Sequence, residues 1–260
     1  SVLENGRKLG LKVINPGSIT RDIVDEIRRI NPDVIYSVYY RKIFPKELID
    51  IPKLGCINIH PSMLPKYRGP VPTAWAIAQG EKETGVTIHY VDSGIDTGDI
   101  LIQKSFPIFD DETGFQLYTR LMKAGAELLR DSLPDILQNR LVGRKQVGIG
   151  SYYGKLDGKL EIDWRQRAED IRNAIRVYSK PFNPAETKLF NRYLLINSAT
   201  VLVDNKHPAQ VPGRIVDILE GGKIVVSCAD GCLVLDDCEF APLLSDSEKP
   251  IYLKRGNKFE

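Results

Sequence analysis

A helical pattern lies between two short apolar runs near the start of the chain. Apolar residues recur from Ile23 to Ile30 at helical spacing, and the pattern stops before Pro32. The runs 11–14 and 33–38 beside it, and 55–59 further on, have the length and β-branched content of strands. Rapid alternation of strand, helix and strand predicts an α/β fold, a Rossmann-like parallel sheet with flanking helices.

The chain begins in the tail of a helical pattern, which Gly10 ends. An α/β sheet normally opens with a strand. We therefore expect that a leading strand–helix unit of roughly 30 residues or more belongs before Ser1.

The sequence pattern changes twice in the rest of the chain. Two strand patterns, 86–91 and 100–104, flank a glycine-containing bend and predict a hairpin, and a long amphipathic helix follows from Thr113. A polar, glycine-rich stretch then precedes several closely spaced short strands. We predict an α/β domain over 1–140, a linker over 141–155, and a smaller antiparallel OB-like β-barrel over 156–260.

Composition excludes several classes of protein. The 36 basic and 34 acidic residues nearly cancel, which does not favour an extended nucleic-acid groove. No apolar run could span a membrane, and the N-terminus has no export signal, so the cytoplasm is the expected compartment. The 4 cysteines are too sparse for a disulfide framework and lack metal-binding spacing, so we expect reduced thiols and no metal site.

Three polar residues stand out as candidates for chemistry. Asn58 and His60 lie two apart at the end of a predicted strand, so their side chains share one face. Asp96 lies in the glycine-containing bend 94–99, where a backbone can approach a ligand closely. A carboxamide can stabilise an oxyanion, an imidazole can move a proton, and a carboxylate can orient the imidazole, which together suit acyl transfer. Residue type and spacing alone do not distinguish this trio from three structural residues.

Two longer motifs carry a family resemblance. The run 57–69 resembles the N-x-H-x-S-x-L-P-x-x-x-G signature of the folate-dependent formyltransferases, and the run 85–100 resembles their second signature. The separation of His60 and Asp96, 36 residues, also matches that family. Ser93 is a small departure outside the trio. The family includes enzymes that formylate amino sugar nucleotides and enzymes that formylate methionyl-tRNA.

The resemblance implies a role for each matching residue. Asn58 would stabilise the oxyanion formed at the formyl group of 10-formyltetrahydrofolate, the donor co-substrate. His60 would act as a cation on that carbonyl, and Asp96 would keep His60 charged and act as a base. The expected donor contacts are Tyr40, Ile43, Phe44, Leu64, Val91, Gly94, Ile95 and Asp96. His89 is expected to be structural.

The sequence leaves open which amine accepts the formyl group. The expected substrate contacts are Ser62, Lys66, Tyr67 and Arg68, of which the last three suit a phosphate and equally suit a solvated loop. The run Tyr39-Tyr40-Arg41 is similar to sugar-nucleotide formyltransferases and favours an amino sugar nucleotide. Initiator methionyl-tRNA is the alternative, and hydrolysis of the formyl donor or non-catalytic folate binding are weaker ones. The oligomeric state is open, with a dimer as one option.

Overall fold

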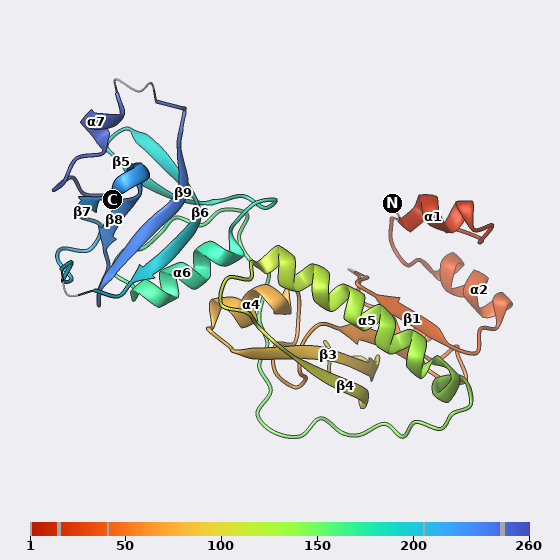
Figure 1. The fold of residues 1–260 in the computed structure, drawn as a ribbon. Helices are drawn as coiled ribbons and strands as arrows, with labels where there is room; N and C mark the ends of the chain where they lie inside the picture. The colour runs from red at the N-terminus through yellow and green to blue at the C-terminus, as the bar shows by residue number, and fades with distance from the viewer. Residues whose placement is uncertain (1, 15–16, 41, 205, 245–247) are drawn as a thin grey trace.

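The computed structural model describes residues 2–14, 17–40, 42–204, 206–244 and 248–260. It contains two sheets, each with its own hydrophobic core (Figure 1). The first sheet has four strands in the order β1-β2-β3-β4, and the second has five in the order β5-β6-β9-β8-β7.

Helices and strands are interspersed in the first half of the chain, and strands predominate in the second half. The helices are α1 (Val2–Lys8), α2 (Arg21–Ile30), α3 (Lys46–Ile49), α4 (Pro72–Ala78), α5 (Gly114–Leu137), α6 (Ala168–Val177), the 3-10 turn η1 (Glu220–Gly222) and α7 (Lys249–Tyr252). The strands are β1 (Ile35–Val38), β2 (Cys56–His60), β3 (Glu83–Tyr90), β4 (Ile100–Pro107), β5 (Ala185–Leu189), β6 (Arg192–Leu202), β7 (Ile215–Ile218), β8 (Ile224–Ser227) and β9 (Cys232–Ala241).

One face of the first sheet is apolar and packs against the long helix α5. Gly125 of α5 lies against Ile59 of β2 and Val86 of β3, and a side chain at this position would crowd Ile59. Leu117 and Leu121 of α5 are fully buried in the same core. The predicted helix from Thr113 is thus confirmed, and its apolar stripe fixes which face of the sheet stays polar.

The first sheet is mixed, which corrects the predicted parallel sheet. Strands β1 and β2 run parallel, whereas β3 pairs antiparallel with both β2 and β4. The connection 61–82 stays at the end of the sheet where β2 stops, so β3 has to return in the opposite direction. The hairpin of β3 and β4 is confirmed, whereas the predicted strand over 11–14 is coil.

The second sheet is antiparallel, as predicted, but does not close into the predicted barrel. Among the described residues its edge strands β5 and β7 do not pair with each other. Irregular chain covers these edges instead. Glu161 forms an isolated bridge to β5, and the C-terminal residue Glu260 donates its N–H to Lys188 of β5, while Ile215 of β7 donates to Asn257.

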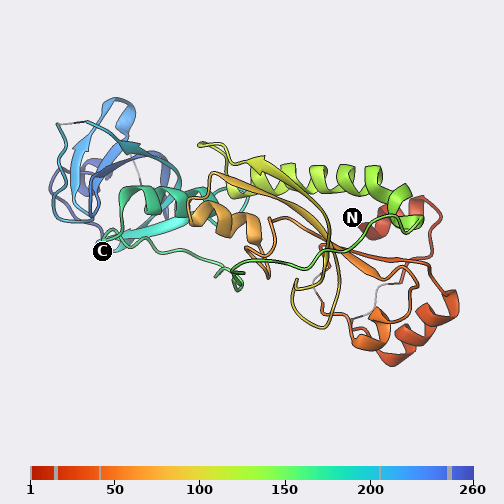
Figure 2. The ribbon, with the colours of Figure 1, turned by 90° about the horizontal axis from the view of Figure 1, so that it is seen from below.

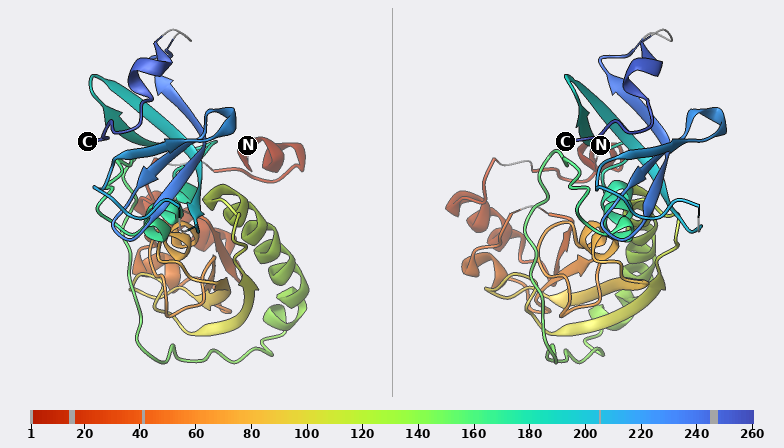
Figure 3. Two further views of the ribbon diagram at one scale, coloured as in Figure 1. Left: turned by 60° about the vertical axis from the view of Figure 1, so that its left-hand side comes forward. Right: turned by 90° about the vertical axis from the view of Figure 1, so that its left-hand side faces the viewer.

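Helix α6 joins the two halves because it packs against both α4 and β6. The segment 141–155, which we call the strap, leaves the end of α5 and runs as extended chain past the first sheet toward the second (Figures 2 and 3). No helix in the described ranges is long and apolar enough to cross a bilayer.

Helix α5 begins with a reciprocal cap. The Thr113 hydroxyl accepts a hydrogen bond from the Gln116 N–H at 3.3 Å, and the Gln116 side chain accepts one from the Thr113 N–H at 2.8 Å. We expect Thr113→Ala to lower the free energy of unfolding by about 1 kcal/mol, because a helix N–H loses its acceptor. Urea titration measures this. Thr113→Ser keeps the hydroxyl and should retain most of the stability, so equal losses in the two variants would contradict a capping role.

Candidate active site

The polar face of the first sheet holds a cross-strand pair. Asn58 of β2 lies directly opposite His89 of β3, and the Asn58 Nδ2 atom is 3.1 Å from His89 Nε2. His89 Nδ1 is 2.8 Å from the Tyr90 carbonyl oxygen, so Nδ1 carries the proton and Nε2 accepts from Asn58. His60 lies two residues further along β2 on the same face.

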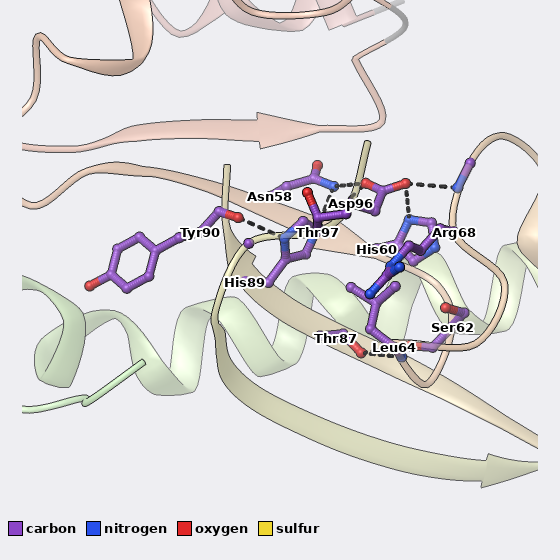
Figure 4. Close-up of polar contacts among 12 residues, drawn as sticks. Asn58, His60, Ser62, Leu64, Arg68, Thr87, His89, Tyr90, Asp96 and Thr97 are labelled. Atoms are coloured by element: carbon purple, nitrogen blue, oxygen red, sulfur yellow. Dashed lines mark hydrogen bonds and ion pairs between the residues drawn. The ribbon is translucent and has the colours of Figure 1, made fainter. Parts of the chain in front are cut away.

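Asp96 reaches this face from the loop after β3 (Figure 4). One carboxylate oxygen, Oδ1, accepts from Asn58 Nδ2 at 3.3 Å and lies 3.6 Å from His89 Nε2. The other, Oδ2, accepts from the Gly69 N–H at 2.9 Å and lies 3.5 Å from His60 Nδ1. The structure therefore brings the Asn58 carboxamide and the His60 imidazole together at the Asp96 carboxylate.

The carboxyl group of Asp96 is held ionised. Burial raises the pKa of Asp96, but the imidazolium forms of His89 and His60 and the Gly69 N–H favour the carboxylate and lower that pKa to about 2. Its side chain is only 15 % exposed, so water contributes little to stabilising this charge.

His60 behaves differently from the expected cation. Burial of its ring lowers the pKa of His60, and this effect outweighs Asp96 and the Tyr67 carbonyl, which both raise it. The Nε2–H group of His60 donates to the Tyr67 carbonyl at 2.8 Å, which leaves the Nδ1 lone pair toward Asp96. His60 is thus neutral in the resting site at neutral pH.

The loop 61–69 is held by its own hydrogen bonds. The fully buried Ser62 donates its hydroxyl to the Lys66 carbonyl at 2.7 Å, and its own carbonyl accepts from the Thr87 hydroxyl at 2.7 Å. Leu64 is buried, and its N–H donates to the same Thr87 hydroxyl at 3.2 Å. In this structure Ser62 therefore stabilises the loop that carries Tyr67 and Gly69.

The predicted donor contacts lie on loops at both ends of β2. The loop after β1 and the loop 61–69 begin where β2 ends, whereas the loop after β3 begins beside Cys56, where β2 starts. Tyr40 and Phe44 follow β1, which runs parallel to β2, and their rings lie 5.6 Å apart. Ile43 and Ile95 are exposed, and Gly94 donates its N–H to the Asp92 side chain at 3.0 Å. Val91 donates its N–H to the Cys56 carbonyl at 2.8 Å. Arg41, the third residue of the Tyr39-Tyr40-Arg41 run, lies outside the described residues.

The predicted acceptor contacts have partners within the chain. Lys66 and the Tyr67 hydroxyl both bind Glu81, at 3.1 Å and 2.9 Å. Arg68 instead binds Gln146 of the strap through Nε at 3.1 Å and Nη2 at 2.7 Å. Of this group, only Arg68 has its side chain linked to a residue that also contacts the Asp96 loop.

Two residues of the site escaped the sequence analysis. His89 contacts both Asn58 and Asp96, although we expected only a structural role; the matched alternation of 57–60 and 86–89, once paired as antiparallel strands, could have identified it. Gln146 lies in a stretch with no periodic apolar pattern, and nothing in the sequence around it indicated a contact with the Asp96 loop. Within the described residues, no group of three or more histidine, cysteine or acidic side chains is arranged to hold a metal ion.

Comparison with known proteins agrees with this geometry. Residues 12–133 match the formyl transferase family, and residues 157–242 match the C-terminal domain of formyl transferases. A curated relative, the methionyl-tRNA formyltransferase of Clostridium tetani, is 38% identical over 257 residues, covering 96% of this chain and 80% of its own.

Solved structures show the same fold. An N-formyltransferase from Helicobacter canadensis, solved with folinic acid and dTDP-3-aminofucose, has a TM-score of 0.69 at 25% identity and covers 90% of this chain and 82% of its own. A sugar N-formyltransferase from Shewanella sp FDAARGOS_354 has a TM-score of 0.64 at 31% identity, covering 77% of this chain and 81% of its own. On the sequence match across both halves and the shared fold, this chain belongs to the formyl transferase family.

Proposed function

We propose that the chain transfers the formyl group of 10-formyltetrahydrofolate to the amino group of methionyl-tRNA. The observation that carries formyl transfer is the contact of one carboxylate, Asp96, with both Asn58 and His60. The donor supplies an activated formyl carbon. The exposed Tyr40 and Ile95 and the half-buried Phe44 lie on the loops that follow β1 and β3, and their apolar side chains suit a flat pterin ring.

The resting geometry assigns a proton path to His60. Its Nδ1 lone pair can accept the proton that the attacking amine loses, and Asp96, 3.5 Å away, stabilises the imidazolium that results. His60 then returns this proton to N10 of the folate as the bond from N10 to the formyl carbon breaks. The new bond joins the formyl carbon to the acceptor nitrogen, so atoms and charge balance.

Asn58 stabilises the oxyanion only after a small rearrangement. Its two amide N–H groups bind His89 and Asp96 in the resting site. The bond to Asp96, at 3.3 Å, is the longer one, and it exchanges for the oxyanion when substrate enters. His89 keeps hold of the other N–H and so orients the amide.

The relatives favour tRNA over the amino sugar that Tyr39-Tyr40-Arg41 suggested. The curated relatives named methionyl-tRNA formyltransferase match almost the whole chain, at 38% and 39% identity in two cases. The solved sugar enzymes share 25% and 31% identity. An amino sugar nucleotide is therefore the second candidate acceptor, supported by these structures.

An acceptor screen tests the proposal. With 10-formyltetrahydrofolate present, we expect formylated methionyl-tRNA, detected by mass after hydrolysis of the ester, and no product from a 4-amino or 3-amino sugar nucleotide. Uncharged tRNA is the control for the amine. Formylation of the sugar nucleotide alone would contradict methionyl-tRNA as the acceptor and support the amino sugar nucleotide. Formate release without any amine would show that the chain is a hydrolase.

Substitutions in the trio test the chemistry. We expect Asn58→Ala to lower kcat by roughly 100- to 1000-fold and His60→Ala by roughly 100- to 10000-fold, because an oxyanion donor or a proton carrier is lost. Near-ultraviolet circular dichroism should show an intact fold. His207→Ala is the matched control, since His207 lies in the loop between β6 and β7, where it contacts Asp204 and Asp217. A residual rate near wild type in either trio variant would exclude the proposed roles.

Acid titration tests the charge of Asp96. Because its folded pKa of about 2 lies below the ordinary 3.8, it stabilises the fold above pH 4 and loses this contribution as pH falls from about 4 toward 2. The contribution is of order 2 kcal/mol. Asp96→Asn should flatten the fall in unfolding free energy over that range in urea titrations. Asp131→Asn removes an exposed carboxylate of α5 and should not; identical curves for the two variants would contradict an ionised, paired Asp96.

A further inference from the structure

The strap (141–155) is bound to both loops that form the site. Near its start, Arg144 exchanges two backbone hydrogen bonds with Ile100, at the end of the Asp96 loop, at 2.7 Å and 2.9 Å. Near its end, Ser151 donates its N–H to the Pro65 carbonyl at 3.1 Å and accepts from the Arg68 N–H at 2.9 Å. The strap therefore spans from the loop carrying Asp96 to the loop carrying Gly69.

Between these anchors the strap turns one side chain inward. Gln146 is half-buried, whereas Val147 and Ile149 beside it are 83% and 96% exposed. The Gln146 Nε2 atom donates to the carbonyls of Asp96 at 2.7 Å and Gly98 at 2.9 Å. Its Oε1 atom accepts both hydrogen bonds from Arg68. Both the donor and the acceptor ends of the amide are thus fully used.

The backbone that Gln146 holds is unusual. Asp96 has a φ of +53°, a conformation that costs energy for a residue with a side chain. Gly98 allows the close turn, because a Cβ atom there would overlap the Tyr90 carbonyl oxygen. Two carbonyls in this turn point at one amide group. Without that group, the turn loses the interaction that offsets its strain.

We infer that Gln146 is a positioning residue: it fixes the backbone of Asp96 so that the carboxylate reaches Asn58 and His60, and it couples this loop to Arg68. Arg68 is the one predicted acceptor-binding cation whose side chain is joined to the catalytic loop. An acceptor that engages Arg68 acts on the same amide that holds Asp96. The kinetic part of this inference rests on the proposed function.

Two substitutions separate the two ends of the amide. Gln146→Leu removes both, and we expect kcat to fall by about 10- to 100-fold, as displaced catalytic groups do, together with a higher KM for the acceptor. Gln146→Glu keeps an acceptor for Arg68 but turns a carboxylate toward two carbonyls. It should lower kcat as much as Gln146→Leu while leaving the acceptor KM near wild type. Val147→Ala, next along the strap and exposed, is the control and should leave both constants unchanged.

A double-mutant cycle shows whether Gln146 acts through Asp96. If it does, Gln146→Leu should cost little further activity in an Asp96→Asn background, measured by single turnover. An equal loss of activity in both backgrounds would overturn the inference.

Hydrogen exchange gives a readout that needs no catalysis. Backbone amides of residues 94–99 should exchange faster in Gln146→Leu than in wild type, with the second sheet unchanged. Unchanged exchange in 94–99 would overturn the inference whatever the kinetics. If the wild-type chain formylates no acceptor, the proposed function fails, and the exchange result still decides whether Gln146 holds the loop.

Discussion

The matched alternation of β2 and β3 determines both the packing and the chemistry of the first sheet. Ile57 and Ile88 are fully buried on the side of α5, so Asn58, His60 and His89 must point to the opposite side. Each buried aliphatic residue contributes roughly 1.5–3 kcal/mol. A slip of one residue in either strand would expose several of them, a loss comparable with the whole stability of an ordinary domain. Helix α5 therefore specifies the polar face without touching it.

A buried carboxylate is the second constraint. Asp96 carries a charge at 15 % exposure, and such a charge is tolerated only where donors surround it. Its donors come from two other parts of the chain, the Asn58 amide on β2 and the Gly69 N–H on the following loop. The segments must therefore be held in register with one another, and Gln146 contacts the backbone of the same residue from a fourth. A buried carboxylate on a loop needs this support because a loop alone does not fix a geometry.

The sequence predicted what local patterns control. Helix α2, the hairpin of β3 and β4 and the start of α5 after Thr113 follow from spacing and terminal residues a few positions apart. The direction of β3 could not be predicted in this way, because it depends on whether the connection 61–82 stays at the end of the sheet where β2 stops or crosses to the other end. Local patterns also could not predict that the second sheet stays open, because irregular chain bonds to both edge strands where a closed barrel would pair them with each other. The motifs pointed to Asn58, His60 and Asp96, which the structure brings together, whereas Gln146 contacts a residue 50 positions away and has no local signature.

The protonation of His60 shows why the same three residues can be read in two ways. From sequence, a carboxylate near an imidazole predicts a cation, because opposite charges attract. In the structure the His60 ring is 4% exposed. The cost of burying a charge on this ring exceeds the stabilisation that the Asp96 carboxylate provides from 3.5 Å away, so the pKa of His60 is lowered. The resting pair is therefore an ionised carboxylate beside a neutral base. That arrangement suits the proposed transfer, in which the amine gives up a proton, because the attraction of Asp96 would then be available at the step where His60 becomes charged.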